Sequence, residues 1–390
     1  MRKLLVAGLA GCLAFGLMAS PASAVGLGGA QLDLPGIQVD LSGGADALPA
    51  LKVHTWILAD ATTGQVLAAK KAHKQRSPAS TLKTLTALTL LPRLALNGTF
   101  TGTPKAANSD GAQVGVQAGK QYTIEQLLYG MMLPSGNDAA VALAQANGGV
   151  RTTVDEMNAL ADQLQAVDTQ ATTPNGLDSP GQVSSAYDLA LIARAGLARS
   201  DFSTIVSTKR YAFPSKGGGT HLIYNLNQML TSGFRGAIGV KTGFTTKAGR
   251  TFVGAATRKG HTLIFVGMGI KEASKTAAED ALAWGFANLS KLTPVGTLVD
   301  PTTPLPQTSS SALAATPQAE QPAEAVATVI PAPSLTPDPV ASAAISQAAL
   351  KIPTTPAQSP SWWLGLIVLA VIGALLLGFN ASRNRRRRLR

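Results

Sequence analysis

Apolar residues recur at two different spacings between residues 51 and 292. Short runs rich in Val, Ile, Leu and Phe, bounded by Gly, Thr and Asp, predict strands. Five such runs occupy residues 53–58, 66–69, 239–243, 251–257 and 263–269. Helical patterns fill the long interval between the second and third runs, and another follows the last run. Strands at both ends of a domain with helices between them indicate an α+β fold with one mostly antiparallel, five-stranded sheet flanked by helices.

Proline and capping signals mark the expected helix boundaries. Pro78 stands where the first turn of a helix tolerates proline, and Pro92 ends the same pattern. Thr123 is followed by Gln126 at the spacing of a capping box. The helices predicted in this way cover residues 78–91, 123–132 and 277–289, and further helices begin near Asp138, Thr153 and Ser185.

The first 24 residues have the pattern of a secretory signal peptide. Arg2 and Lys3 precede an apolar run, and Ala22-Ser23-Ala24 supplies small residues where cleavage is expected. An uncleaved anchor helix is the alternative. The segment before Cys12 also has the form of a short lipoprotein signal, with Cys12 as the lipidated residue.

The rest of the chain divides by composition. Residues 25–50 are rich in Gly, Ala, Leu and Asp without a clear period, and we expect a flexible leader there. Residues 51–292 are expected to form one globular domain. Residues 293–360 are rich in Pro, Ala and Thr and have little apolar surface to bury, which predicts a linker.

The C-terminus carries a second membrane signal. Residues 361–380 contain an uncharged apolar run of about the length that spans a bilayer, with Trp362 and Trp363 at its start. The arginine-rich tail 381–390 follows at once, so we expect it to be cytoplasmic. The sequence therefore predicts a single-pass protein of the cell membrane with its globular domain outside the cytoplasm.

The charge and the cysteine count exclude several classes of protein. The formal net charge is +12, but the six arginines of the tail, with Arg2 and Lys3, supply eight of these charges. The remaining chain is too weakly basic to suggest nucleic-acid binding. Cys12 is the single cysteine, which excludes an intrachain disulfide and a cysteine metal site. The four histidines lie in no metal or Ser-His-Asp motif, so we expect neither a metal nor a cofactor.

Ser80 and Lys83 form the first chemical motif, S-x-x-K. Positions i and i+3 lie on one face of a helix, so the amine falls beside the hydroxyl. A lysine can act as a base if burial or nearby cations lower its pKa. By itself this short pattern often occurs by chance.

Two further motifs strengthen the interpretation. Ser135-Gly136-Asn137 lies in a turn between helices, where a hydroxyl can relay protons and an amide can hold a carbonyl. Lys241-Thr242-Gly243 opens a strand, where glycine lets a substrate backbone approach closely. An ordinary turn and a surface strand are the alternatives for each motif taken alone.

The three motifs, in this order on helix, loop and strand, form the signature of the penicillin-recognising serine enzymes. The chain resembles the serine-type D-alanyl-D-alanine carboxypeptidases, the low-molecular-mass penicillin-binding proteins. The likeness extends to Tyr122–Ala140, Pro174–Asp178 and Lys241–Gly249, and covers roughly residues 53–290. It implies the β-lactamase/DD-peptidase fold, peptidoglycan stem peptides as substrates and β-lactam antibiotics as covalent inhibitors.

The resemblance also implies roles for individual residues. Ser80 would be the acylated nucleophile, Lys83 its general base, and Ser135 the proton shuttle to the leaving D-alanine. The residues implied in substrate binding are Asn137, Lys241, Thr242, Gly243, Phe244 and Thr245. The backbone N–H groups of Ser80 and Phe244 would form the oxyanion hole.

Some features depart from the family and leave alternatives open. Some relatives place an arginine after the strand that follows the third motif, whereas this chain offers Lys271 and Lys275. The alternatives are a β-lactamase, for which no E-x-x-L-N pattern is found, a DD-endopeptidase or transpeptidase on the same fold, and an inactive wall-binding module. Three intact motifs argue against the inactive module.

Overall fold

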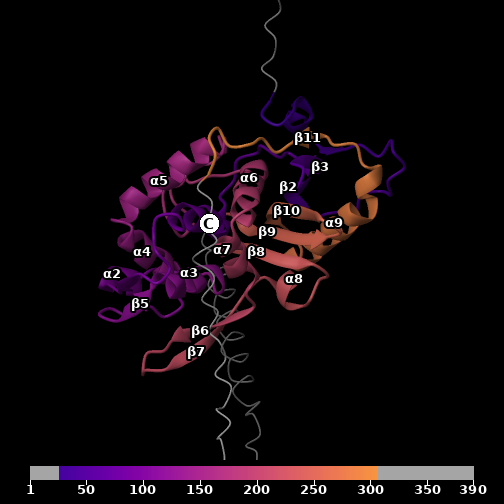
Figure 1. Ribbon diagram of the computed structural model, residues 1–390. Helices are drawn as coiled ribbons and strands as arrows, with labels where there is room; N and C mark the ends of the chain where they lie inside the picture. Colours follow the sequence, from indigo (N-terminus) through magenta and orange to yellow (C-terminus); the bar gives the residue numbers. More distant parts are fainter. Residues whose placement is uncertain (1–25, 306–390) are drawn as a thin grey trace, which may run out of the picture. The chain divides into compact units, whose positions relative to one another are not determined.

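The computed structural model describes residues 26–305, and their centre is one antiparallel sheet. Six strands lie in the order β1 (Ile37–Val39), β3 (Gln65–Lys70), β2 (Val53–Asp60), β10 (His261–Ile270), β9 (Gly249–Arg258) and β8 (Ala237–Thr245). Every neighbouring pair is antiparallel. A short strand, β11 (Gly296–Thr297), also pairs with β3. The sheet thus joins the beginning and the end of the described chain, and β8 is the edge strand at the end opposite β1 (Figure 1).

The predicted α+β fold and antiparallel sheet are confirmed, but the number of strands was wrong. The five predicted runs lie within β2, β3, β8, β9 and β10, whereas the sheet has seven strands. The additional β1 lies in the expected flexible leader, and β11 lies in the expected linker. Strands of two or three residues are too short to show a period of hydrophobicity. They form here because the outer edge of β3 offers backbone groups that need partners.

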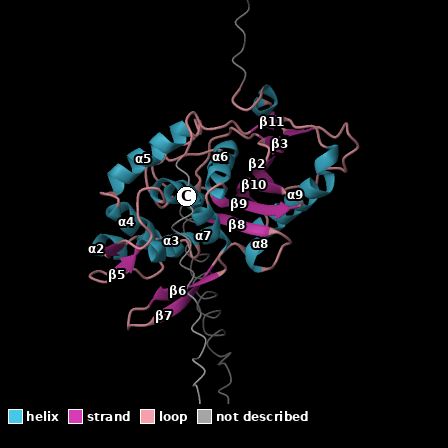
Figure 2. Cartoon of the chain, in the orientation of Figure 1, coloured by secondary structure: helices cyan, strands magenta, loops and turns pink. Residues whose placement is uncertain are grey.

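Helices cover both faces of the sheet, and each face buries its own apolar cluster. The helix α9 (Ser274–Asn288) packs on β9 and β10, and the cluster between them includes Trp56 and Phe265. On the opposite face, α6 (Ala186–Leu197) packs on β2 and β10, and Ile57 and Ile264 belong to the cluster there. Figure 2 shows the strands between α9 and α6. Because both faces are buried, the central strands are nearly continuous apolar runs.

The remaining helices surround the short helix α1 (Lys83–Leu90). It contacts α3 (Ile124–Met132), α4 (Asn137–Ala146), α5 (Val150–Gln163) and α6. All eight of its residues are buried, including three threonines. Their hydroxyls donate to backbone carbonyls: Thr84 to Thr81, Thr86 to Pro174 and Thr89 to Leu85. These bonds allow a polar sequence to occupy the centre of the helical region.

Shorter elements complete the described chain. They are η1 (Ala30–Asp33), η2 (Ala79–Leu82), β4 (Thr99–Thr101), α2 (Pro104–Ala107), β5 (Gln121–Thr123), α7 (Ser200–Ser207), β6 (Arg210–Pro214), β7 (Thr220–Tyr224), α8 (Gln228–Thr231) and η3 (Leu289–Lys291). β4 pairs with β5, and β6 pairs with β7, in two separate hairpins.

The predicted helix starts at Thr123 and Ser185 are confirmed, and α4 begins at Asn137, next to Asp138, whereas the start predicted near Thr153 was too late in the chain. Thr123 forms a complete capping box, and the Ser185 side chain accepts the Asp188 N–H. However, α5 begins at Val150, before Thr153, and Asp138 lies inside α4 after its N-cap residue Gly136. Asp138 has a different role, which is described below.

The segments predicted at the two ends lie outside the described residues. These are the signal peptide at residues 1–24, residues 306–360 of the linker, the membrane span at 361–380 and the tail at 381–390. Between residues 26 and 305, no helix combines the length and the apolar character needed to cross a bilayer.

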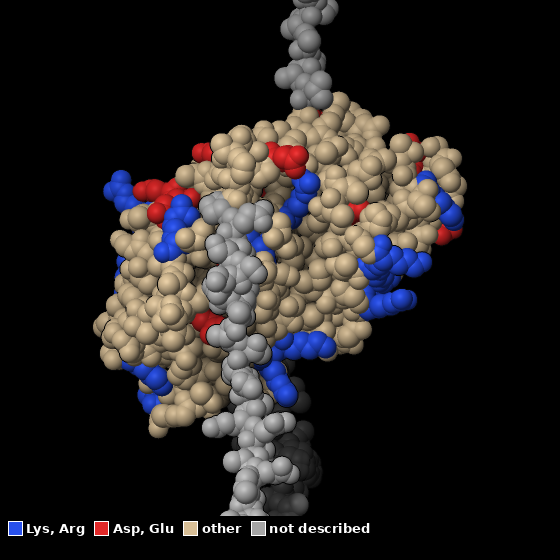
Figure 3. Space-filling view, viewed as in Figure 1, with Lys and Arg blue, Asp and Glu red and all other residues tan. Residues whose placement is uncertain are grey.

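The face drawn in Figure 3 is largely uncharged, with small groups of Lys and Arg at its right-hand and lower margins.

Candidate active site

The Ser80 hydroxyl lies at the junction of η2 and α1. Ser80 is the second residue of η2, and Lys83 is the first residue of α1. Lys83 Nζ donates to Ser80 Oγ over 2.9 Å. The sequence spacing therefore does bring the hydroxyl and the amine together.

Lys83 is fully buried and has two further acceptors. Its Nζ donates to Asn137 Oδ1 over 2.7 Å and to the Asn175 carbonyl over 2.5 Å. Burial lowers the pKa of Lys83 well below its usual value, the charge of Lys241 lowers it further, and Asp138 opposes them. Asn175 was not among the predicted site residues, although the segment Pro174–Asp178 was noted as similar to the family.

The turn between α3 and α4 carries the second motif. Ser135 lines the cleft and has a left-handed backbone with φ of 68°, a conformation that costs a residue other than glycine of order 1–3 kcal/mol. Asn137 is 2% exposed, accepts from Lys83, and donates through Nδ2 to the Asp110 carbonyl over 2.6 Å. Asn137 is thus hydrogen-bonded to the protein through both atoms of its side-chain amide, to Lys83 through the oxygen and to Asp110 through the nitrogen.

Asp138 supports this turn from behind. Its buried carboxylate accepts the backbone N–H groups of Val114, Gly115 and Val116, as well as its own neighbour Ala139. It therefore fixes the loop that precedes α3 against the start of α4. Helix-capping statistics could not predict this, because the bonded loop lies more than twenty residues earlier in the chain.

The third motif lies on the edge strand β8. Lys241 is 1% exposed, burial lowers its pKa to about 7, and its Nζ donates to the Thr242 carbonyl over 2.9 Å. A Cβ added to Gly243 would lie 2.9 Å from the backbone nitrogen of Ser80, so only glycine lets β8 approach η2 this closely. Thr251 on β9 secures the same contact by donating to the Pro78 carbonyl over 2.8 Å.

The last two predicted residues differ in position. Phe244 lines the cleft and is 66% exposed. Thr245 instead accepts the Ala248 N–H through its hydroxyl, which closes the turn between β8 and β9. Accepting this bond leaves the Thr245 O–H available as a donor, which is what a contact with a substrate carboxylate would need.

A cleft of about 450 Å³ joins these groups. Its lining consists of Ser80, Ala112, Ser135, Leu226, Gln228, Thr242, Gly243, Phe244, Arg250, Phe252, Ala273, Ser274 and Lys275. Two cations are present in this lining, Arg250 from β9 and Lys275 from the first turn of α9. Lys275 was an expected candidate and Arg250 was missed, while Lys271 lines a different depression.

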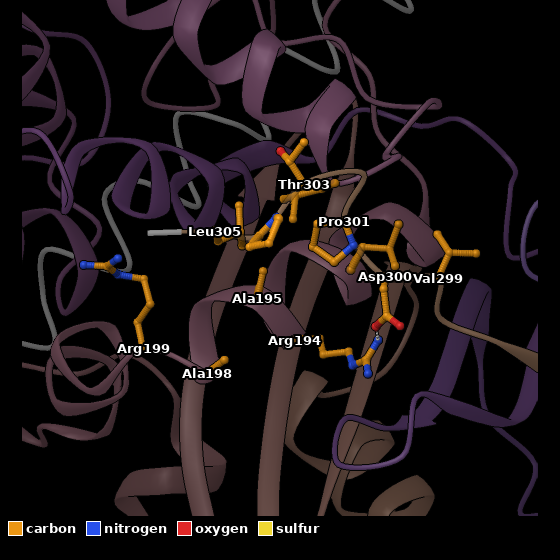
Figure 4. Close-up of a pocket in the computed structure, with 12 residues that line it drawn as sticks. Arg194, Ala195, Ala198, Arg199, Val299, Asp300, Pro301, Thr303 and Leu305 are labelled. Carbon is orange, nitrogen blue, oxygen red and sulfur yellow. Dashed lines mark hydrogen bonds and ion pairs between the residues drawn. The ribbon is translucent and has the colours of Figure 1, made fainter. Parts of the chain in front are cut away.

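A second cavity, of about 480 Å³, shares no residue with this cleft. It lies between α6 and the segment 299–305, where Arg194 binds Asp300 (Figure 4). No nucleophile or perturbed base lines it, so its size alone does not make it an active site.

One group in the described part of the chain has the residue types of a metal site. Ligand atoms of His73, Asp168 and Asp188 lie within 4.8 Å of one another. The ring nitrogens of His73 already bond Asp168 Oδ2 at 2.9 Å and the Leu27 carbonyl at 3.0 Å. Asp188 accepts the Thr169 hydroxyl through Oδ2 over 2.7 Å, and its buried Oδ1 has no hydrogen-bond partner among the described residues.

Comparison with known proteins gives a consistent result. The family model described as D-alanyl-D-alanine carboxypeptidase, peptidase family S11, matches residues 44–272. The chain is 43% identical over 262 residues to D-alanyl-D-alanine carboxypeptidase DacB2 of Mycobacterium tuberculosis, which covers 65% of this chain and 89% of that protein. It is 35% identical over 257 residues to DacD of Escherichia coli, covering 62% of this chain and 65% of the other.

Solved structures agree with the sequence comparisons. A crystal structure of a D-alanyl-D-alanine carboxypeptidase from M. tuberculosis has 41% identity and a TM-score of 0.61, covering 66% of this chain and 98% of that one. The DD-transpeptidase of Streptomyces K15 has 32% identity and a TM-score of 0.59, covering 62% of this chain and all of the other. The matched family model spans more than half of the chain, and the chain therefore belongs to the D-alanyl-D-alanine carboxypeptidase family, peptidase family S11.

Proposed function

We propose that this protein removes the terminal D-alanine from peptidoglycan stem peptides through an acyl-enzyme on Ser80. The observation that carries the proposal is the 2.9 Å contact between Ser80 Oγ and the fully buried Lys83 Nζ, beside an open cleft. Membership of the carboxypeptidase family supplies the class of reaction.

Lys83 has the surroundings that a general base requires. The Asn137 and Asn175 oxygens can only accept, so they take both N–H groups of a neutral amine. In this neutral form the 2.9 Å contact with Ser80 is reversed, so that the lone pair of the nitrogen accepts the Ser80 hydroxyl. The lowered pKa of Lys83 favours this neutral form, and the lysine takes the hydroxyl proton as Ser80 attacks the penultimate carbonyl.

The oxyanion of the tetrahedral intermediate would be held by the backbone N–H groups of Ser80 and Phe244. Gly243, the residue before Phe244, lies directly against the Ser80 backbone, which supports this pairing of donors. Such donors are often worth about 3 kcal/mol each. Ser135 lines the same cleft and would pass the proton to the departing D-alanine nitrogen.

The terminal carboxylate of the substrate would lie beside Thr242. Two cross-strand pairs of the β8–β9 hairpin lie here, Thr242 with Phe252 and Phe244 with Arg250. Because the two pairs are two positions apart, all four side chains share one face of the hairpin. Lys275 reaches the same cleft from α9. Arg250 and Lys275 would supply the positive charge that an arginine supplies in some relatives.

Water completes the reaction by attacking the acyl carbonyl, which releases the shortened peptide and restores the Ser80 hydroxyl. A β-lactam would acylate Ser80 in the same way, because its strained amide mimics the dipeptide. Transpeptidation is the second candidate function, favoured by the similarity to the K15 DD-transpeptidase. An acceptor amine would then replace water, and analysis of the products formed from a pentapeptide with and without an amine acceptor distinguishes the two.

Intact-mass spectrometry after exposure to penicillin tests the proposal. The wild-type protein should gain one covalent adduct, and Ser80→Ala should gain none. Lys83→Ala should acylate at least about 10²-fold more slowly, since general-base assistance is worth about 10²–10⁴-fold. Ser232→Ala, an exposed serine outside the cleft, is the control and should label normally. An adduct that persists in Ser80→Ala would overturn the assignment.

The proposal extends to the place of the enzyme in the cell. The signal peptide at 1–24, the apolar span at 361–380 and the arginine tail support a catalytic domain outside the membrane and a cytoplasmic C-terminus. This arrangement would hold the cleft within reach of the cell wall.

A further inference from the structure

A small depression on the described domain is lined largely by lysine. Its volume is about 340 Å³. Its lining, which we call the lysine pocket, consists of Leu51, Lys52, Val53, His54, Lys70, Lys71 and Lys271. Four lysines and one histidine thus line a space large enough for a small ligand, and one of the four ammonium groups, Lys70 Nζ, also donates to the Val53 carbonyl over 3.1 Å.

The sheet brings these residues together from three distant parts of the sequence. Lys52 precedes β2, Lys70 ends β3, and Lys271 follows β10. Ile270 of β10 pairs with Val53 of β2, and the Lys271 N–H donates to the Lys52 carbonyl over 2.9 Å. The convergence is therefore a result of strand register and involves ordered backbone.

The positive charges of the lysine pocket lack neutralising partners. In the described part of the chain, none of its four lysines has a carboxylate within 4 Å of its amine. The nearby Glu272 carboxylate accepts the backbone N–H of Lys52 over 2.8 Å. Burial first, and then the charges of Arg76, Lys71, Lys70 and Lys271, lower the pKa of His54. The charges felt at His54 are thus all positive.

Lys71 occupies a position at which lysine is unfavourable for the backbone. Its φ is 50°, in the left-handed region, and its carbonyl accepts the Lys74 N–H in a turn. Gly or Asn adopts this conformation at lower cost. Lysine nevertheless occupies this turn, and its side chain lines the lysine pocket.

The lysine pocket lies next to the catalytic cleft. Lys271 lines the pocket, while Ala273, Ser274 and Lys275, only a few residues later, line the cleft. One short segment between β10 and α9 therefore forms part of the wall of both. A ligand in the pocket would be held beside the substrate.

We propose that the lysine pocket binds a phosphate group, either as the free anion or as a phosphate ester of a small alcohol. Several compact ammonium groups around one space match an anion with more than one charge, and phosphate carries about −1.5 to −2 as a monoester at pH 7. A single carboxylate would balance only one of the lysines and is more often bound by the planar guanidinium of arginine. This site is separate from the proposed peptidase reaction.

Titration calorimetry of the full-length chain with inorganic phosphate tests the site. Sodium chloride at equal ionic strength serves as the blank, because salt screens exposed charges. The variant Lys52→Gln/Lys71→Gln should bind phosphate at least about tenfold more weakly, which corresponds to about 1.4 kcal/mol. The control Lys105→Gln/Lys259→Gln removes the same charge, and Lys259 shares the left-handed backbone with φ of 49°. The control should bind like the wild type.

Equal weakening in both double variants, or no binding beyond the chloride blank, would refute the site. Glycerol 1-phosphate is the second probe, and tighter binding than that of inorganic phosphate would identify an ester as the ligand. Penicillin acylation of Ser80 is measured in parallel and should be unchanged in both variants. If the wild-type protein binds phosphate but penicillin does not acylate it, the result counts against the peptidase function and leaves the phosphate site standing.

Discussion

Two buried lysines, Lys83 and Lys241, define the electrostatics of the site at the scale of single residues. Burial is the main reason why the pKa of each is lowered, and the charge of Lys241 adds to the effect on Lys83. Asp138 opposes this effect on Lys83. Lys241 therefore assists the base indirectly, in addition to any contact with substrate.

Replacing Lys241 by Gln should move the pH dependence of acylation. Removing the neighbouring cation raises the pKa of Lys83, so the amine becomes available as a base only at higher pH. The rising limb of the penicillin acylation rate against pH should shift to the alkaline side. Stopped-flow measurement of acylation from pH 5 to 10 tests this expectation.

Lys247→Gln is the matched control for this experiment, because Lys247 is exposed at the turn after β8. Its profile should follow the wild type. A rising limb that stays in place in Lys241→Gln would show that Lys241 acts on substrate alone.

The site residues that sequence reasoning missed act through long-range contacts. The Asn175 carbonyl reaches Lys83 across 92 positions of sequence, and Asp138 holds a loop 22 to 24 positions away. Arg250 enters the cleft because it pairs across the hairpin with Phe244. None of these contacts has a local signature in the sequence.

At the scale of elements, a charged hydrogen-bond group joins the N-terminal segment to the helical region. Both ring nitrogens of His73 face acceptors, Asp168 Oδ2 and the Leu27 carbonyl, so the ring must carry two protons to donate to both. Burial opposes this state, but the hydrogen bond and charge of Asp168 outweigh it and raise the pKa of His73. The imidazolium also packs on the Tyr187 ring at 4.5 Å.

His73→Gln should destabilise the protein most at mildly acidic pH. A histidine with a raised folded pKa stabilises fully below its unfolded value near 6.5, and this stabilisation is lost as the pH rises through the folded value. At pH 6 the loss should be about 1.5–3 kcal/mol, the usual worth of a charged hydrogen bond. The difference in melting temperature between wild type and variant should shrink between pH 6 and 9.

Comparing the two proteins at each pH removes the effects of groups that both share. The two buried lysines of the active site, which lie outside the His73 cluster, contribute equally to both curves. A difference in melting temperature that is independent of pH would contradict the charged state of His73.

At the scale of the whole molecule, the final described segment is part of the folded domain. Val295 and Leu298 are buried, and the Tyr187 hydroxyl donates to the Thr297 carbonyl over 2.7 Å. Arg194 donates to the Leu298 carbonyl and pairs with Asp300. Truncating the chain at residue 292, the expected end of the domain, would therefore remove contacts with the core.

A fragment ending at residue 292 should be less stable than one ending at 305. Burial of Val295 and Leu298 is worth about 1.5–3 kcal/mol each. For a domain of this size 1 kcal/mol shifts the melting temperature by about 2–4 °C, so the shorter fragment should melt at least about 5 °C lower. Calorimetry of the two fragments compares them directly, and equal melting temperatures would show that the segment 293–305 only rests on the surface.

Protease accessibility tests the proposed topology of the whole chain. Protease added to intact, wall-stripped cells should release a soluble fragment that retains penicillin binding and ends within residues 306–360. The arginine tail should stay protected. Digestion of the tail from outside, with the catalytic domain intact, would reverse the proposed orientation.

The local sequence determined much of this protein. The central strands, the nucleophile helix and the capping box at Thr123 follow from apolar runs, prolines and capping residues, because these signals act over a few neighbouring positions. The contact between Ser80 and Lys83 follows in the same way from helical spacing. The order of the three motifs was sufficient to indicate the enzyme family.

Only the tertiary structure decided how distant residues meet. Four features depend on contacts between segments far apart in the chain. They are the position of β8 beside η2, the short strands β1 and β11, the contact of Lys83 with the Asn175 carbonyl, and the lysine pocket. Such contacts form because buried backbone and charged groups need partners, and many segments could supply them. Packing of the complete domain determines which segment supplies the partner, so neither the spacing of residues nor the composition of the sequence predicts it.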